Sequence, residues 1–562
     1  MANTSPKYRI RPIAEGSLID HLLFHRGVKT LEEKDAFLNP DYNKGIHDPF
    51  LMKDMDKVVS RIIDAINKKE KICIYTDYDA DGIPAGVVFH DFFKKISYEN
   101  VMFYIPHRHK EGFGLNSDAV EKIAKQGAKL LITADCGIAD VDEVAHANSL
   151  GMEVVVTDHH LPHDVLPAAF AILDPQQPGC NYPEKILCGS GVVYKLIQGL
   201  YQKLGLKEGM EKWSLDMVGL ATLSDMVPLV GENRILASYG LRVMRKTPRV
   251  GLCELFKSLK LDQKTLAEDD VQFLVTPRIN AASRMADPVL AFELLSTDDI
   301  QKAKGLCKVL TDINTDRKVQ VALISKEIKK NHSDADFQAV PLIVVGNPNW
   351  KPALLGLVAN SLMRDYQKPA FVWGRDEEGI IKGSCRSNGS YHLVDLMSAV
   401  EPGVFHEAGG HAMSGGFAVS NDHIHLISDH LIKALDKVSI SEIDSAIDVD
   451  SLISLSDINW KFWEALDKMA PFGEKNAKPL FMFQKITVVG YKKFGKAGEH
   501  VEVRIGNSDG AVLPAISFFN AENPTYQLSQ SDVIDMVATI EKSNFKGRPE
   551  LRLRIVDIIK SK

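Results

Sequence analysis

The stretch IYTDYDADGIPAG, residues 74–86, places three aspartates, Asp77, Asp79 and Asp81, at every second position directly after an apolar run. Three carboxylates at such close quarters repel one another and raise one another's pKa. A chain gains no stability from such a cluster unless a positive charge compensates it. The stretch therefore points to a bound cation, and its surroundings show what that cation could do.

Four apolar runs predict the strands of one sheet. Each is short, rich in β-branched residues and bounded by polar turns: KICIYT (71–76), VMFYI (101–105), KLLITA (129–134) and EVVVT (153–157). Helical stretches separate them, for instance SDAVEKIAKQG (117–127) and ADVDEVAHANSLG (139–151). Strand and helix alternating at this spacing predict a parallel sheet that helices cover on both faces.

Further acids and histidines follow the other strands. Asp135 comes after KLLITA, and the run Asp158, His159, His160 comes after EVVVT. The carboxyl ends of parallel strands share one edge, where ligands bind. Asp225, at the end of an apolar helix in ATLSDMVPLVGENR (221–234), could close the same site. Any one aspartate alone is more often a cap or turn residue, but four clusters at matching positions would repel one another without a cation.

The types of ligand indicate the kind of ion. Carboxylates with one or two imidazoles suit Mn²⁺ or Mg²⁺ better than Zn²⁺, which favours sulfur and nitrogen. Some six or seven ligand groups are too many for one ion. Two ions bridged by a shared carboxylate fit this number, and such a pair catalyses in-line displacement at a phosphoryl group.

Composition limits the class of protein. The chain has 562 residues, enough for about three or four domains. No apolar run approaches the roughly 18 residues that span a bilayer, and the start MANTSPKYRI lacks the apolar region of a signal peptide. The seven cysteines form no C-x-x-C pair. The cysteines indicate a reducing, cytoplasmic compartment, and the lack of a long apolar run indicates no membrane partner. We also expect a monomer.

Charge is uneven along the chain. Pro471 to Lys562 carries 14 Lys and Arg against 10 Asp and Glu, whereas the other 470 residues have 53 against 64. An acidic body with a mildly basic C-terminal part could hold metal ions in one region and a polyanion in the other. Chance variation between domains explains the same numbers.

The chain divides into five predicted segments. Residues 1–70 form a helical region packed on a first α/β domain, 71–298. Residues 299–332 form one long amphipathic helix that connects it to a second, smaller α/β domain, 333–440; a long core helix is the alternative. Residues 441–562, rich in short strands with turn signals, predict a small β-barrel.

Several motifs together resemble a known family. DYDADG (77–82), ADCG (134–137), DHH (158–160) and SDMVPLVGENR (224–234) are similar to the four motifs of the DHH superfamily of phosphoesterases. TPRINAASRM (276–285), KGSCRS (382–387) and GGHAMSGGF (409–417) narrow the resemblance to its RecJ branch, from about residue 70 to the C-terminus. The resemblance implies a DHH domain, a DHHA1-like domain and a C-terminal OB-fold barrel that binds single strands.

The resemblance assigns residues to the metal ions. Two Mn²⁺ or Mg²⁺ would be held by Asp77, Asp79, Asp81, Asp135, His159 and Asp225. Asp135 would bridge the ions, and Asp158 would support its neighbours. His160 would lie beside the scissile phosphate and assist in charge stabilisation or proton transfer, or instead orient a ligand by a hydrogen bond.

The resemblance also assigns residues to the nucleic acid. Arg108, Ser384 and Arg386 would hold the 5′-phosphate. The contacts to the strand would come from Arg278, Asn280, Arg284, Lys351 and His411. The catalytic residues would be Asp135, His160 and Arg278. On the barrel, the candidates are Lys492, Lys493, Phe494, Lys496, Arg548 and Arg552. Each of these cations alone would more often be a surface charge.

Two stretches differ from familiar motifs. Lys351, in NWKPALLG, stands where the family has histidine, so a cationic contact survives but a role that needs imidazole does not. HEAGGH (406–411) imitates a zincin helix with the wrong histidine spacing and two glycines. We expect a glycine loop there, with its backbone close to substrate and His411 near a phosphate.

The implied activity is stepwise hydrolysis of single-stranded DNA from its 5′ end, with release of 5′-mononucleotides, in recombination and repair. Family partners would be a single-strand-binding protein and a helicase. One alternative is a DHH phosphodiesterase of short oligonucleotides or cyclic dinucleotides, but those chains are shorter and lack the barrel. The other is a non-catalytic strand-binding member, which would have lost acids that are all present here.

Overall fold

The computed structural model describes residues 7–440, 446–543 and 547–560. It divides into two compact units. The larger unit comprises Pro49–Asp225 and Val243–Asp444, and the smaller comprises Met1–Asp48, Met226–Arg242 and Ser445–Lys562.

The larger unit contains a five-stranded parallel sheet in the order β3-β2-β4-β5-β6. Its strands are β2 (Ile72–Thr76), β3 (Val101–Tyr104), β4 (Leu130–Ala134), β5 (Glu153–Thr157) and β6 (Ala171–Leu173). The four predicted strands are confirmed, and β6 is an addition. From β2 the chain goes first to one neighbour, β3, and then to the other, β4. The sheet reverses its direction of winding here, which is where such sheets bind ligands.

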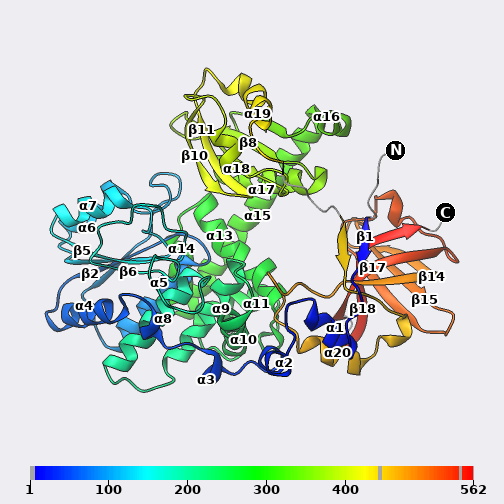
Figure 1. Ribbon diagram of the computed structural model, residues 1–562, viewed down its shortest axis with the longest axis horizontal. Helices are drawn as coiled ribbons and strands as arrows, with labels where there is room; N and C mark the ends of the chain where they lie inside the picture. Colours follow the sequence, from blue (N-terminus) through cyan, green and yellow to red (C-terminus); the bar gives the residue numbers. More distant parts are fainter. Residues whose placement is uncertain (1–6, 441–445, 544–546, 561–562) are drawn as a thin grey trace. The chain divides into compact units, whose positions relative to one another are not determined.

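Helices cover both faces of this sheet (Figure 1). On one face, α6 (Ser117–Lys125) and α7 (Val141–Ser149) bury Val120 and Val144 against Tyr75 and Leu131 of the sheet. On the other face lie α4 (Met55–Asn67), α5 (Gly82–Lys95) and α8 (Gly189–Lys203). Strands β2 and β4 are buried along their whole length, which explains their continuous apolar sequences.

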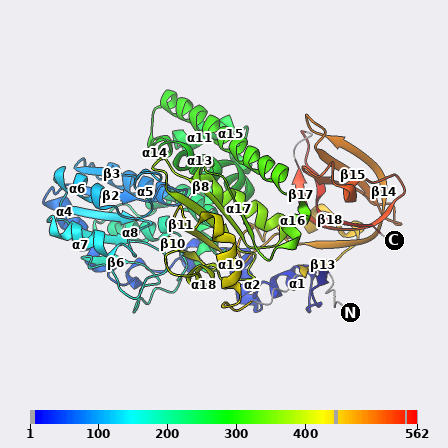
Figure 2. The ribbon, with the colours of Figure 1, turned by 90° about the horizontal axis from the view of Figure 1, so that it is seen from above.

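Helices continue the larger unit after α8. They are α9 (Leu215–Ser224), α11 (Val250–Ser258), α13 (Thr276–Met285), α14 (Val289–Ser296) and α15 (Ile300–Asn331). The long helix predicted over 299–332 is therefore confirmed as α15, a single helix of 32 residues (Figure 2). It contacts α11, α13 and α14 before it in the sequence and α17 after it.

A second sheet follows α15, with strand order β10-β11-β9-β8-β7. Its elements are β7 (Ile343–Gly346), α17 (Pro352–Tyr366), β8 (Ala370–Arg375), β9 (Ile381–Arg386), α18 (Leu393–Ser398), β10 (Phe405–His411), β11 (Ser414–Val419) and α19 (Ile427–Leu435). Our prediction of a glycine loop at HEAGGH (406–411) is wrong. Those residues belong to the edge strand β10, which pairs antiparallel with β11. The glycines of β10 adopt a strand conformation because pairing with β11 provides hydrogen-bond partners for their backbone N–H and C=O groups.

The smaller unit is built on a closed barrel. Strands β14 (Phe481–Phe494), β15 (His500–Gly506), β16 (Val512–Ser517), β18 (Glu550–Lys560) and β17 (Val533–Ser543) pair in that order, and β17 closes on β14. The short strand β13 (Ser451–Leu452) pairs parallel with the first residues of β14, and α20 (Trp460–Asp467) precedes the barrel. The predicted C-terminal barrel is confirmed, although residues 441–445, 544–546 and 561–562 of the predicted 441–562 segment lie outside the described residues.

The N-terminal segment differs from our expectation. Residues 8–45 belong to the barrel's unit: β1 (Tyr8–Ile10) pairs with β12 (Ile447–Val449), and α1 (Leu18–Phe24) and α2 (Leu31–Leu38) lie in that unit, as does most of α10 (Gly231–Met244). Leu22, Leu23 and Phe37 are buried in the barrel core. The amphipathic pattern shows that a helix buries one face, but it does not show which core receives that face.

Over the residues that the structure describes, no helix is both long and apolar enough to cross a membrane. All seven cysteines are free, and only Cys253 is not buried.

Candidate active site

The loop after β2 brings three carboxylates to the carboxyl edge of the sheet. Asp77 and Asp81 are almost fully buried. Asp79 Oδ1 accepts hydrogen bonds from the backbone N–H groups of Asp81 (2.7 Å) and Gly82 (3.2 Å), which turns the chain into α5. A Cβ atom at Gly82 would lie 2.5 Å from the carbonyl oxygen of Asp77. Glycine is required here because the backbone passes so close to Asp77.

The amino terminus of α8 holds the Asp81 carboxylate. The backbone N–H groups of Gly189 and Ser190 donate to its two oxygens at 2.6 and 2.7 Å. These N–H groups have no partner within the helix, and the helix dipole favours an anion at this end. The small residues CGSG at 188–191 were the available signal in the sequence, and they do not figure among the predicted site residues.

Asp135 follows β4 in a left-handed backbone conformation, with φ of 68°. Such a conformation is uncommon outside glycine, although aspartate and asparagine tolerate it better than other residues. It directs the buried carboxylate toward Gly189, where a Cβ atom would lie 2.4 Å from Asp135 Oδ1. Strained conformations of this kind cluster at functional sites.

Asp158 orients the two histidines that follow it. Its Oδ1 accepts hydrogen bonds from His159 N and from His160 Nδ1, both at 2.7 Å, and its Oδ2 accepts one from Ile138 N at 2.9 Å. A carboxylate only accepts, so Nδ1 of His160 carries the proton and Nε2 is left for another contact. Burial acts to raise the pKa of Asp158, but the His160 hydrogen bond, the charges of both histidines and the Ile138 hydrogen bond together outweigh it, and the pKa is lowered.

Two groups of three ligands lie side by side at this edge. Asp77, Asp79 and Asp135 bring oxygen atoms within 4.8 Å of one another, and so do the ligand atoms of Asp81, His159 and Asp225. The groups meet where His159 Nε2 lies 3.0 Å from Asp135 Oδ1. His160 forms a third group with Asp135 and His159. The six residues assigned to metal are therefore together, with Asp135 at the junction.

These residues fit divalent cations. One oxygen of Asp77 and one of Asp135 are buried without a hydrogen-bond donor. Burial, and then the charges of Asp81, Asp79 and Asp77, raise the pKa of Asp135 well above its usual value. Unpaired buried carboxylates of this kind are stabilised by bound cations, and their oxygens with one imidazole suit Mn²⁺ or Mg²⁺.

The metal-free protein is expected to become less stable as pH rises. Burial, and then the charge of Asp81, raise the pKa of Asp225 to about 7, against about 3.9 in an unfolded chain. Between these values the folded state binds more protons than the unfolded state, so the free energy of unfolding falls with increasing pH. In EDTA, calorimetry should show a Tm a few degrees higher near pH 5 than near pH 8. Mn²⁺ should reduce this difference because it binds the deprotonated groups. A Tm that increases with pH in EDTA would contradict the assignment.

Three arginines, Arg108, Arg284 and Arg386, form a cationic cluster beside the carboxylates. Burial and then Arg108 lower the pKa of Arg284 to about 10, and Arg108 also acts to lower the pKa of Arg386. Arg108 lies over the Tyr78 ring at 5.1 Å, and Arg284 donates to the Ala353 carbonyl at 2.9 Å. Within the described part of the chain, none of the three forms an ion pair. The charge of Asp79 acts on Arg284 without forming an ion pair with it, so the cluster has room to bind a further anion.

Two residues lie elsewhere than expected. Asn280 Oδ1 accepts a hydrogen bond from Ala80 N at 2.8 Å and so supports the acidic loop, a role that its predicted contact with the strand did not include. Arg278, expected to be catalytic, donates to Leu274 O at 2.6 Å and to Thr311 Oγ1 of α15 at 3.4 Å. Its charged neighbour is Arg317, so it belongs with the cations of α15 rather than with the carboxylates.

The second sheet supplies the remaining candidates. Ser384 and Arg386 lie on β9, and a Cβ atom at Gly356 of α17 would meet Arg386 Nη2 at 3.1 Å. Lys351 caps α17 and is exposed, as is His411 at the tip of the β10–β11 hairpin. The structure thus groups Arg386 with Arg108 and Arg284, and leaves Lys351 and His411 at the surface.

On the barrel, most of the predicted cations have partners. Lys492 pairs with Glu502 at 3.1 Å, Lys493 with Glu522 at 3.1 Å and Arg552 with Glu541 at 2.5 Å. Phe494 lies in a cluster of rings with His500 and Phe518, and next to it Phe519 is 79% exposed. Aromatic rings of this kind stack on bases in OB-folds, so this cluster is a better candidate than the paired lysines.

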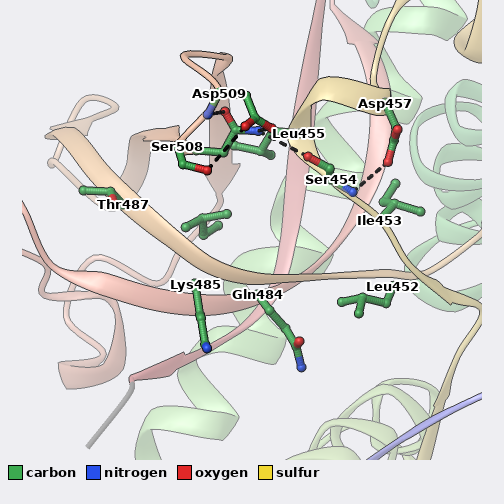
Figure 3. A pocket seen from close by; sticks show the side chains of 12 residues that line it. Leu452, Ile453, Ser454, Leu455, Asp457, Gln484, Lys485, Thr487, Ser508 and Asp509 are labelled. Atoms are coloured by element: carbon green, nitrogen blue, oxygen red, sulfur yellow. Dashed lines mark hydrogen bonds between the residues drawn. The ribbon is translucent and has the colours of Figure 1, made fainter.

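A groove on the barrel, lined by residues 452–455, 457, 484–487 and 507–509, is a poor site for DNA (Figure 3). Asp457 and Asp509 lie on it with Lys485, and Asp457 accepts a hydrogen bond from Ser454 N at 2.8 Å. Two carboxylates against one lysine would repel a phosphate backbone.

Sequence reasoning also missed Asp174. It follows β6, is fully buried, and burial raises its pKa to about 7. Gln176, two residues later, donates to the His159 carbonyl. The apolar run AAFAIL (168–173), a fifth strand followed by aspartate, was the available signal.

Three family models match the chain. The DHH family, N-terminal domain matches residues 71–222, the DHHA1 domain 339–439 and the RecJ OB domain 449–557. The single-stranded-DNA-specific exonuclease RecJ of Bacillus subtilis is 35% identical over 507 residues, which are 90% of this chain and 63% of that protein. This chain therefore spans less than two thirds of that relative. The Haemophilus influenzae protein of the same name is 28% identical over 97% of this chain and 96% of its own length.

Solved structures show the same fold. The crystal structure of RecJ in complex with Mn²⁺ from Thermus thermophilus matches with a TM-score of 0.83, at 22% identity, over 99% of this chain and 80% of that one. The crystal structure of an exonuclease RecJ bound to manganese matches with a TM-score of 0.60, at 27% identity, over 68% of this chain and 95% of that one.

The parallel sheet, its acidic edge and the matched models define a chain with a DHH domain followed by a DHHA1 domain. The C-terminal barrel distinguishes the RecJ branch from other chains with DHH and DHHA1 domains. Its model matches residues 449–557, and relatives named RecJ match nearly the whole chain, so the chain carries the three domains found in the RecJ exonucleases that it resembles.

Proposed function

We propose that this protein is a metal-dependent exonuclease that hydrolyses single-stranded DNA from its 5′ end, releases 5′-mononucleotides and acts in recombination and repair. The observation that carries the proposal is the contrast at one site. Two groups of carboxylates share one imidazole, that of His159, and beside them three arginines form no ion pair among the described residues. Metal ions satisfy the first and the phosphates of a strand satisfy the second.

The chain's own residues would hold and orient the reactants. Asp77, Asp79, Asp81, Asp135, His159 and Asp225 would hold two Mn²⁺ or Mg²⁺. Such ions supply Lewis-acid activation of water and of the phosphate. Asp158 keeps the proton of His160 on Nδ1, so Nε2 is available to the scissile phosphate.

The cationic cluster would fix the end of the strand. Arg108 and Arg386, with Ser384, would hold the 5′-phosphate, and Arg284 would hold the adjoining backbone. Arg278 would contact the strand farther along, beside Arg317. Lys351 and His411 are exposed and would make weaker contacts at the rim. The barrel's ring cluster would bind more distant nucleotides.

Digestion of labelled DNA tests the function. With Mn²⁺ or Mg²⁺, a 5′-labelled single strand should lose its label first as mononucleotide, a 3′-labelled strand should shorten stepwise, and blunt duplex should resist. EDTA should stop all hydrolysis. Faster cleavage of a dinucleotide than of a 50-mer would favour an oligonucleotide phosphodiesterase. Strand binding without cleavage in either metal would favour a non-catalytic member.

The setting of this activity is also part of the proposal. An enzyme that repairs chromosomal DNA would work in the cytoplasm, in keeping with its seven free cysteines. It would act as a monomer, with a single-strand-binding protein or a helicase as a partner that supplies unpaired DNA. Co-purification on immobilised single-stranded DNA tests the partners.

A further inference from the structure

Phe113 is a large apolar side chain exposed beside the candidate catalytic histidine. It is 55% exposed, and its ring meets the ring of His160 edge to face, with 5.5 Å between the centroids. Leu161, directly after His160, is 63% exposed. Apolar side chains that gather at the surface and are rimmed by polar groups mark a binding surface.

The loop that carries Phe113 is anchored on both sides. Before it, the Glu111 carboxylate accepts hydrogen bonds from Tyr104 Oη and from His107 N, the latter at 2.7 Å. After it, the Gly114 carbonyl accepts one from Tyr75 Oη at 2.8 Å, and Leu115 N donates to Asp140 at 2.6 Å. The exposure of Phe113 is therefore a property of an anchored loop.

The two flanking glycines set the direction of the ring. Gly112 and Gly114 both have φ of 80°, a region that other residues rarely adopt. The chain turns sharply on either side of Phe113, and the ring lies next to His160 instead of in the core. Arg108, five residues earlier in the same segment, belongs to the cationic cluster.

We propose that Phe113 stacks on the base of the 5′-terminal nucleotide, the one that is released. This inference rests on the proposed function. One loop would then hold both ends of that nucleotide, with Arg108 at the phosphate and Phe113 at the base. Every base offers a π-face, so the contact accepts all four bases. A paired base must first leave its partner before it can turn onto the ring, so the contact favours an unpaired end.

Substrates that lack one base test the inference. Phe113→Ala should lower kcat/KM about tenfold on a 5′-phosphorylated single strand, the expected loss for one stacking contact, and Phe113→Trp should retain activity. On a strand abasic at nucleotide 1, wild type and Phe113→Ala should be equal. On a strand abasic at nucleotide 2, the tenfold difference should persist. Leu150→Ala, an exposed apolar residue that follows α7 and precedes β5, is the matched control and should match wild type.

Each other outcome overturns the inference. An unaffected Phe113→Ala enzyme, an equal loss on all three substrates, or a loss that disappears only with the nucleotide 2 abasic strand would each do so. The variant's Tm should equal that of wild type, since the ring is exposed. If the wild-type protein releases no nucleotide from any strand, the proposed function is wrong. If both wild type and Phe113→Ala are fully active, only the role of Phe113 is wrong.

Discussion

Asp135→Asn is expected to reduce DNA hydrolysis by at least about a thousandfold. Asp135 lies at the junction of the two ligand groups, 3.0 Å from His159. An amide oxygen is a weaker, uncharged ligand, so the loss should reach the several kcal/mol that metal ions contribute to the transition state. Asparagine is the informative replacement because it tolerates the left-handed backbone at this position, where alanine would add strain.

The same variant should not be less stable than wild type without metal. Removing one of several mutually repelling buried carboxylates relieves the interaction that raises their pKa values. In EDTA near pH 8, its Tm should equal or exceed that of wild type, and added Mn²⁺ should stabilise it less. Asp64→Asn, on the exposed face of α4, is the control and should keep full activity. Near-normal turnover by Asp135→Asn would contradict the proposed bridging position.

Arg386→Ala should lower kcat/KM about 10- to 100-fold on 5′-phosphorylated single strands, the range expected when a charged hydrogen-bonding group is removed. Arg386 lies on β9 near Arg108 and has no ion-pair partner among the described residues. A 5′-phosphate would be that partner. On a strand with a 5′-hydroxyl, wild type loses the same contact, so the difference between variant and wild type should largely disappear.

The control for this variant lies on the neighbouring strand. Arg375, at the end of β8, is exposed and donates to Asn421 at 2.9 Å. Arg375→Ala should match wild type on both kinds of strand, which separates a local contact from a general loss of positive charge. An equal loss by Arg386→Ala on phosphorylated and hydroxyl ends would show that Arg386 contacts the backbone rather than the terminal phosphate.

The sequence by itself determined the parallel sheet and the acidic edge where its strands end. Buried parallel strands require continuous apolar runs, and such strands end at a shared edge, so the run before Asp77 and the run before Asp135 place their carboxylates together. The long helix α15 was equally readable, because 32 residues with helical periodicity and no proline have few alternatives. These features depend on neighbours along the chain.

Only the tertiary structure decided the rest, because it depends on contacts between distant residues. Helix α1 completes the barrel core over 400 residues away, Asn280 supports the acidic loop, Arg278 joins the cations of α15, and HEAGGH is an edge strand because β11 pairs with it. A local pattern records that a side chain is buried, charged or extended. It does not record the identity of its partner, because packing free energy depends on the shape and charge of the surface it meets.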